Sequence, residues 1–392
     1  MENSLIIEHI NIYTEKKLIK DGSILIRHGK IEKIIEGTFE DELDVIDEID
    51  VIDGAGLNVV PGFIDGHIHG AVGYDVMDDD PLALKKMAEY LPKEGTTSFV
   101  ATTITNPLKD IEDAIVRVRD YEAHQGEAEI LGLHIEGPFI EKDKAGAQPE
   151  KDILNPDLDI LEKWLDLARG TIKTMTVAPE LDHDGTFIDM LRNHHINVSI
   201  GHTNATYKDV AVAVKRGANQ MTHLCNAMNG IHHRDVGAVG AAMLIDDLSS
   251  EIIADGIHIS PEMLQILFDS IGPERLMFIT DSMRAKGMAD GAYTLGGQAV
   301  TVKNGQATLS DGTLAGSILK MDEGISYFMN VTNASFYNII QMSSVNPAKQ
   351  LGVFDRKGSI AVGKDADLLI VDDQFNVKQT FCKGVLSYVR GM

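Results

Sequence analysis

Two histidines separated by a single residue give the first indication of chemistry in this sequence. His67 and His69 end a short apolar run that begins at Pro61. On a β-strand, side chains two residues apart project from the same face. Both imidazoles can therefore reach one metal ion. If the strand belongs to a parallel barrel, the pair lies at the C-terminal end of the strand, where such barrels carry their active sites.

Imidazole and carboxylate groups also end other apolar runs of the chain. Taken singly, each is as readily a cap or a packed polar residue as a metal ligand. Caps have no reason to recur at one end of so many strands, however, and this donor set suits zinc or iron. The groups are His134 and Glu136 on the third run, His202 on the fifth, His223 on the sixth, Asp255 and His258 on the seventh, and Asp281 on the eighth.

Strand-like and helix-like segments alternate through the middle of the chain. Eight strand–helix repeats predict an α/β fold, a (β/α)8 TIM-like barrel. A doubly wound sheet is the alternative, but no Gly-x-Gly-x-x-Gly opens a helix after the first strand. The β-like runs are residues 60–65, 97–102, 130–135, 173–178, 197–202, 220–223, 251–255 and 276–281. The amphipathic segments are residues 81–94, 108–123, 157–168, 207–216 and 261–271.

Short alternating runs occur at both ends of the sequence. Residues 4–53 predict a small antiparallel β unit, and alternation returns after residue 358. We expect the two ends to join in a β-sandwich domain of residues 1–58 and 352–392, with the barrel domain formed by residues 59–351. Between residues 293 and 312, Asn-Gly and Asp-Gly pairs predict hairpin turns.

Composition excludes several classes of function. The net charge is 35 − 60 = −25, which disfavours binding to nucleic acid or to an anionic membrane. The two cysteines, Cys225 and Cys382, form no disulfide framework and fit a reducing compartment. No apolar run approaches a membrane span, and the N-terminal residues resemble a strand rather than a signal peptide. These features predict a soluble, cytoplasmic protein.

Seven motifs carry a resemblance to a known family. They are P-G-F-I-D-G-H-I-H-G (61–70), H-I-E-G-P-F (134–139), G-H-T (201–203), T-H-L-C-N-A-M (222–228), D-G-I-H (255–258), T-D-S-M (280–283) and D-G-T-L-A-G-S (311–317). Over nearly its whole length the sequence resembles the amidohydrolase superfamily, and within it the N-acetylglucosamine-6-phosphate deacetylase family. Many amidohydrolases bridge two metals with a carbamylated lysine, whereas this family uses a glutamate.

The resemblance implies metal-dependent removal of the acetyl group from N-acetylglucosamine 6-phosphate. Glu136, His202 and His223 match the ligands of the main metal. His67 and His69, with Glu136 bridging, match a second position, so one or two divalent ions are expected. Histidine and carboxylate accept zinc or iron, and also manganese or cobalt. Asp281 matches the catalytic acid/base.

The resemblance also implies substrate contacts. Asn226 and Ala227 match a loop whose backbone amides meet a phosphate. His258 and Arg234 match phosphate-contacting positions, with Arg234 reaching across from the neighbouring subunit of a homodimer. Without the resemblance, Arg234 is best interpreted as a surface residue. Residues Leu314, Ala315 and Gly316 match a loop that closes over the sugar.

The sequence departs from the family pattern at one position. Some members carry a histidine after the residue that matches Ala147, and this histidine polarises the acetyl carbonyl. Here the residue is Gln148, which donates an N–H but carries no charge. Either Gln148 acts more weakly or the metal polarises the carbonyl itself. Residues 141–150 contain glycine and proline and predict a mobile lid.

Other interpretations remain open at this point. A different amidohydrolase, such as a cyclic amidase or an aminoacylase, often needs a bridging lysine. An inactive scaffold usually loses its ligands, whereas this sequence keeps them. Cys225 is a candidate thiol nucleophile by residue type. It lies between ligand and substrate positions of a motif that needs no thiol, so we do not assign it that role. His134 is best interpreted as a packed core histidine.

Overall fold

One of the two eight-stranded sheets is a closed ring of parallel strands. The structure is a computed structural model that describes residues 4–39 and 49–391. Ile68, at the end of the first strand, forms a parallel bridge with Ser282 after the last one. The Asp281 amide also donates to the His67 carbonyl at 2.9 Å. The strands therefore close, which confirms the predicted barrel. In spatial order they are β6 (Phe63–Ile68), β9 (Thr96–Thr102), β10 (Glu129–Glu136), β11 (Ile172–Val177), β12 (Asn197–Ile200), β13 (Ala218–Met221), β14 (Ser249–Ile252) and β15 (Leu276–Phe278).

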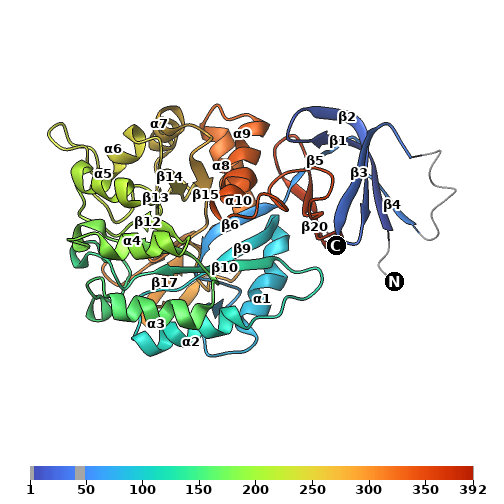
Figure 1. The fold of residues 1–392 in the computed structure, drawn as a ribbon. Coiled ribbons are helices and arrows are strands. Elements are labelled where there is room, and N and C mark those ends of the chain that lie inside the picture. Colours follow the sequence, from blue (N-terminus) through green and yellow to red (C-terminus); the bar gives the residue numbers. More distant parts are fainter. Residues whose placement is uncertain (1–3, 40–48, 392) are drawn as a thin grey trace.

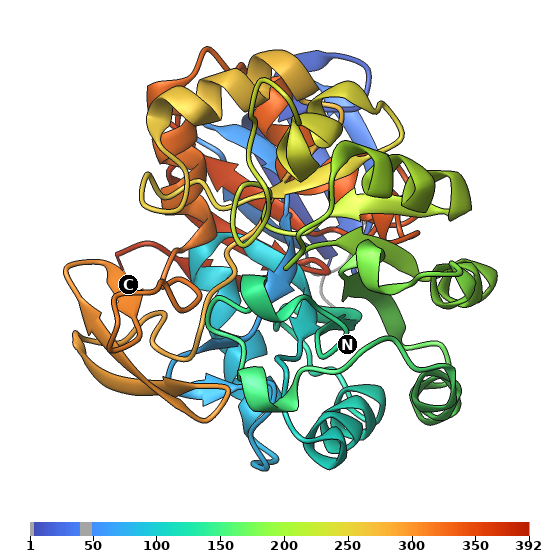
Figure 2. The same cartoon turned by 90° about the vertical axis from the view of Figure 1, so that its left-hand side faces the viewer.

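Helices lie on the outer side of the strands (Figure 2). Side-chain caps fix where several begin, because the first helical N–H groups need acceptors. Asp157 caps α3, and Thr206 caps α5 in a reciprocal pair with Asp209. The five predicted helices are present, although the second is shorter than expected. The helices are α1 (Ala83–Tyr90), α2 (Leu108–Arg119), α3 (Leu158–Ala168), α4 (Thr186–Asn193), α5 (Tyr207–Arg216), α6 (Gly237–Leu244), α7 (Pro261–Ile271), α8 (Met321–Val331), α9 (Phe336–Ile340) and α10 (Asn346–Gln350).

Both ends of the chain meet in a second eight-stranded sheet beside the barrel (Figure 1). Its strands come from both termini, as predicted. The expected antiparallel arrangement is only partly correct, because β4 and β5 pair with β1 in parallel. The strands are β1 (Ser4–Tyr13), β2 (Leu18–Arg27), β3 (Lys30–Glu36), β4 (Ile49–Asp53), β5 (Asn58–Pro61), β19 (Leu368–Val371), β20 (Val377–Cys382) and β21 (Val385–Val389). Residues 1–3 of the N-terminal run lie outside the described residues.

The first barrel strand begins later than the sequence indicated. The run at residues 60–65 is not one strand: Val60 and Pro61 belong to β5, which pairs with β19, and β6 starts at Phe63. Gly62 lies between the two strands, where a Cβ would lie only 2.1 Å from Thr97 Oγ1. Residues 59–61, which our domain prediction gave to the barrel, therefore pair with the terminal sheet.

Smaller elements complete the fold. The predicted turn at Asn304 and Gly305 is present, with φ of 52° and 83°. It joins two strands of a three-stranded antiparallel sheet, at the left of Figure 2. No helix in the described part of the chain is both long and apolar enough to cross a membrane. These strands are β16 (Gly291–Leu295), β17 (Gln298–Lys303) and β18 (Gln306–Thr308), and a two-stranded ribbon consists of β7 (Gly70–Ala71) and β8 (Tyr74–Asp75).

A buried ion pair supports the point where the barrel closes. Lys286 and Glu94 are both 0% exposed, and their charged atoms lie 2.5 Å apart. Lys286 also donates to Thr280 Oγ1 at 3.4 Å, and that hydroxyl donates to Asp65 at 2.6 Å. Asp65 and Thr280 precede the site residues of β6 and of the segment after β15. The pair therefore lies directly below the residues that could do chemistry.

Replacing Lys286 with methionine is expected to lower the free energy of unfolding by about 3–5 kcal/mol, because Glu94 then stays buried without its partner. Burial already raises the pKa of Glu94 to about 7, against the effect of Lys286. A raised carboxyl pKa favours the folded state at low pH, so the loss should deepen as the pH rises through neutrality. Urea denaturation at several pH values measures this. The Glu94→Gln/Lys286→Met double variant should recover most of the stability; a double variant no better than the single one would contradict the assignment.

Candidate metal centre and active site

One carboxylate and two imidazoles converge at the C-terminal end of the barrel. Glu136 is the last residue of β10, and His202 and His223 each follow a strand by two residues. Glu136 Oε1 lies 3.2 Å from His202 Nε2 and 3.0 Å from His223 Nε2, and the two nitrogens are 3.1 Å apart. Ligands of one tetrahedral ion with bonds of about 2.0–2.1 Å lie about 3.3 Å apart. The spacing of these three atoms therefore fits a shared cation.

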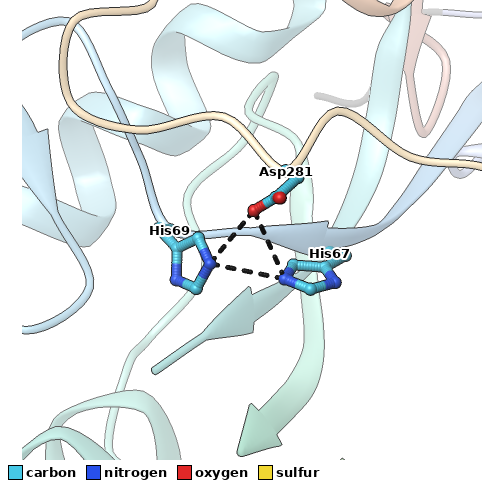
Figure 3. A group of neighbouring side chains, drawn as sticks. All are labelled: His67, His69 and Asp281. Atoms are coloured by element: carbon cyan, nitrogen blue, oxygen red, sulfur yellow. Dashed lines mark hydrogen bonds and ion pairs between the residues drawn. The ribbon is translucent and has the colours of Figure 1, made fainter. Parts of the chain in front are cut away.

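A second group lies beside the first (Figure 3). His67 and His69 come from the end of β6, and Asp281 comes from the segment after β15. The two Nε2 atoms are 3.3 Å apart and lie 3.5 and 3.2 Å from Asp281 Oδ1. Glu136 joins the groups, with Oε1 3.6 Å from His67 Nε2 and Oε2 3.3 Å from His69 Nε2. The arrangement provides two adjacent cation positions with Glu136 between them.

In three of the four histidines of the centre, the ring nitrogen that faces away from it has an acceptor that fixes the tautomer. His202 Nδ1 donates to the Lys144 carbonyl at 2.7 Å, and His69 Nδ1 donates to the Thr102 carbonyl at 3.2 Å. His67 Nδ1 donates to Glu251 at 3.0 Å. With the proton on Nδ1, each Nε2 lone pair is directed to the centre. This is how metal-binding histidines are held in proteins, so the residues present fit a divalent metal.

The centre attracts positive charge. Burial raises the pKa of the Glu136 carboxyl, but His67, His202 and His223 more than offset this and hold it well below its usual range. Burial likewise opposes ionisation of Asp281, yet His67 and His69 lower its pKa to about 2. The same carboxylates raise the pKa of His69 to about 9 against the effect of burial. Both acids are ionised at neutral pH.

Several residues at these strand ends adopt a left-handed backbone conformation. The φ angles are 46° at His202, 29° at His223 and 47° at Asp281, and Cys225 and Ala227 also have positive φ. Such angles cost residues with a Cβ of order 1–3 kcal/mol each, and they cluster at functional sites. Here the turn directs each side chain inward as the strand ends.

A cavity of about 310 Å³ opens onto both groups. It contains most residues that the sequence singled out for substrate contact. Ala315 is an exception: it is fully buried outside the cavity, and its backbone N–H donates to the Ala307 carbonyl. Arg234 lies away from the cavity on an exposed segment, where it donates to His233 at 2.8 Å. The predicted residues that line the cavity are His69, Glu136, Ala147, Gln148, His202, His223, Asn226, Ala227, His258, Asp281, Leu314 and Gly316.

The segment that holds Gln148 is anchored to the centre. Gln148 is buried, its Nε2 donates to Glu136 Oε2 at 2.7 Å, and its Oε1 accepts from the Thr105 amide at 2.8 Å. The Glu141 amide also donates to the carbonyl of His202 at 2.9 Å. These bonds hold residues 141–150 against the centre, and the prediction that the segment opens as a lid stays a prediction. They also engage one N–H of Gln148 with the metal-facing carboxylate.

The loop after β13 differs from expectation in one respect. The backbone N–H of Asn226 donates to the His223 carbonyl at 3.0 Å, so it is not available to a phosphate. The Asn226 side chain donates to the same carbonyl at 3.2 Å. Cys225 behaves as predicted, because burial raises the pKa of its thiol to about 12 and disfavours a thiolate. His134 packs against His67, with ring centres 4.6 Å apart.

Two carboxylates to which the sequence analysis gave no specific role hold site histidines. Asp255 Oδ2 accepts from His258 Nδ1 at 2.6 Å. Glu251, on β14, accepts from His67 and is 1% exposed. Sequence reasoning placed Glu251 only at the start of an apolar run. An acid directly before the apolar residues Ile252, Ile253 and Ala254 was the available signal, because a buried acid needs a partner.

Comparison with known proteins agrees with this geometry. A model of the amidohydrolase family matches residues 58–386. The chain belongs to the amidohydrolase family. Members of this family use a divalent metal, as the donor set indicates. The bridging position here is a glutamate, which disfavours the lysine-bridged alternatives.

Relatives within the family narrow the comparison. The chain is 46% identical to N-acetylglucosamine-6-phosphate deacetylase of Bacillus subtilis (strain 168), over 99% of this chain and 98% of the relative. It is 34% identical to N-acetylgalactosamine-6-phosphate deacetylase of Escherichia coli O157:H7, over 83% and 87%. The crystal structure of N-acetylglucosamine-6-phosphate deacetylase from Pasteurella multocida superposes with a TM-score of 0.90 at 31% identity, over 98% and 99%.

Proposed function

We propose that this amidohydrolase removes the acetyl group of N-acetyl-D-glucosamine 6-phosphate, yielding D-glucosamine 6-phosphate and acetate. The observation that carries the proposal is the pair of buried histidine–carboxylate groups around Glu136, opening onto a cavity that also holds His258. The relatives that share the full length of the chain have names that agree with this substrate. The activity belongs to amino-sugar catabolism.

The metal would be held by Glu136, His202 and His223, with a second position formed by His67 and His69. Zinc or iron suits these donors best, and manganese or cobalt is also accepted. A bound divalent ion lowers the pKa of water to about 7 and polarises a carbonyl. Since one Gln148 N–H already donates to Glu136, we assign carbonyl polarisation mainly to the metal.

Asp281 is the proposed acid/base. Its carboxylate is ionised, lines the cavity and lies beside the centre, so it can accept the proton of the attacking water. An amine cannot leave as an anion, so the same carboxyl group then delivers this proton to the departing nitrogen. One side chain thus completes both proton transfers.

The phosphate is assigned to His258, with the Ala227 amide and Asn226 nearby. Burial lowers the pKa of His258, but the hydrogen bond to Asp255 and its charge more than offset this, so the pKa is raised. The imidazole therefore stays cationic to a higher pH than a free histidine and suits an anionic group. Leu314 and Gly316 close the sugar side of the cavity.

Arg234 is proposed to act in a homodimer. It is exposed and away from its own cavity, and the neighbouring Ile231 is 54% exposed, as expected of a segment that contacts a second copy. Light scattering measures the oligomeric state, and a monomer at assay concentration would contradict this. We also propose a cytoplasmic location, supported by two cysteines that remain free thiols.

Replacing Asp255 with asparagine should shift the pH dependence of KM. Without the carboxylate, the pKa of His258 falls, so its positive charge is lost at a lower pH. A hydrogen bond to a charged group contributes about 1.5–3 kcal/mol, so KM should rise about tenfold or more at a pH where only the wild type is charged. KM measured across about pH 6 to 9 tests this. N-Acetylglucosamine without phosphate is the control and should show no such shift.

Acetate release tests the function itself. The assay compares N-acetylglucosamine 6-phosphate, its galacto epimer and unphosphorylated N-acetylglucosamine, with and without a chelator. We expect kcat/KM to favour the phosphate ester over the free sugar by about 10–100-fold, from charged hydrogen bonds, and a chelator to abolish activity reversibly. Equal activity on the unphosphorylated sugar would overturn the proposal. Preference for the galacto epimer would reassign the substrate.

A further inference from the structure

Glu251 touches both halves of the centre from below. It lies on β14 with its side chain inside the barrel and is 1% exposed. Its Oε2 accepts from His67 Nδ1 at 3.0 Å and from the backbone N–H of His223 at 3.1 Å. Its Oε1 accepts from Gln220 Nε2 at 2.6 Å. One carboxylate oxygen therefore holds a ligand of each cation position.

The two contacts control different properties of the ligands. Toward His67, the acceptor keeps the proton on Nδ1, so the Nε2 lone pair is directed to the second position. Toward His223, it holds the backbone of a residue with φ of 29°, a conformation that costs free energy unless its surroundings enforce it. The His223 side chain then meets Glu136 and His202.

We propose that Glu251 is a positioning residue that makes cation binding at the two positions interdependent. This rests on the proposed metal-dependent function. A cation held by His67 Nε2 would make the Nδ1–H more acidic and so strengthen its hydrogen bond to Glu251. The same oxygen also holds the backbone of His223. Binding of a cation at one position should therefore change the affinity of the other position for its cation. Polar partners of metal ligands typically contribute 10–100-fold to affinity.

Gln220 makes a sharp pair of variants possible. Its Oε1 is buried without a hydrogen-bond partner in the described structure. In Glu251→Gln, the new amide can keep its oxygen on His67 and His223 and donate to Gln220 Oε1 once that side chain turns over. This variant removes the charge and keeps the hydrogen bonds. Glu251→Leu removes both.

The experiment titrates metal-free protein with Co²⁺, following visible absorption and counting bound metal by mass spectrometry. We expect two equivalents in the wild type, about 10–100-fold weaker binding of both in Glu251→Leu, and a smaller loss of both in Glu251→Gln. Glu94→Gln is the matched control, because Glu94 is equally buried but pairs with Lys286. Its Co²⁺ affinities should equal those of the wild type even if its stability falls.

Three results would overturn the proposal. One is wild-type affinity at both positions in folded Glu251→Leu. Another is weakening of only one position. The third is a wild-type protein that takes a single equivalent under saturating Co²⁺. If Glu251→Leu does not fold, Glu251→Gln must weaken both equivalents or the proposal is wrong. Absence of acetate release together with these Co²⁺ effects would refute the proposed substrate and leave the role of Glu251 standing.

Discussion

Replacing Asp281 with asparagine is expected to lower kcat for N-acetylglucosamine 6-phosphate by about 10²–10⁴-fold, the usual contribution of a general acid/base. Asparagine has the same shape but cannot accept the water proton or deliver it to the amine. Glu136, His202 and His223 are unchanged, so the metal at their position should remain. Single-turnover acetate release, with metal content measured on the same sample, checks both parts.

Asp255→Asn is a matched control for this change. It is the same acid-to-amide substitution after the neighbouring strand, and Asp255 contacts His258 rather than the centre. It should alter KM and its pH dependence and leave kcat nearly unchanged. If Asp281→Asn kept kcat within about tenfold of the wild-type value, Asp281 would not be the general acid/base, because that role contributes about 10²–10⁴-fold.

Replacing Glu136 with glutamine is expected to remove bound metal from both positions and activity with it. Within the described structure, Glu136 is the only residue whose two carboxylate oxygens together lie within 3.6 Å of all four histidines of the centre, Oε1 facing His67, His202 and His223 and Oε2 facing His69. Its ionised carboxylate also supplies charge that an amide lacks. Loss of a group that hydrogen-bonds to a metal ligand lowers metal affinity by up to about 100-fold. Loss of Glu136, which is proposed to contact the metal itself, should lower the affinity by more than that. Metal content after dialysis and a Co²⁺ titration measure this.

The Glu94→Gln variant again provides the comparison, since Glu94 is an equally buried acid outside both groups. It should keep its metal. If Glu136→Gln retained one full equivalent of metal, the Glu136 carboxylate would not be a ligand shared by both cation positions.

The strand ends were predictable because their signals are local. The i, i+2 spacing of His67 and His69 defines a shared face, and the topology of a parallel barrel brings all strand C-termini to one end. Glu136, His202, His223 and Asp281 follow from the same rule. That is why residues far apart in the sequence could be assigned to one site before their distances were known.

Features that depend on packing were missed. The division of residues 60–65 between two sheets depends on the pairing of β5 with β19 and of β6 with β9, which no local pattern records. Helix α6 is rich in glycine and alanine and almost entirely buried, so it lacks the polar face that reveals a surface helix. The partners of Glu251 and of the Asn226 amide are set by neighbouring strands and turns. The role proposed for Arg234 would require a second copy of the chain.

The pairing of β5 with β19 places a constraint on synthesis. β5 leads through Gly62 into the strand that carries His67 and His69, yet its partner leaves the ribosome only after almost all of the barrel has emerged. Until then one edge of β5 is unpaired, because its other edge pairs with β1. Translation arrested before Leu368 would release a chain in which β5 keeps only its short parallel pairing with β1.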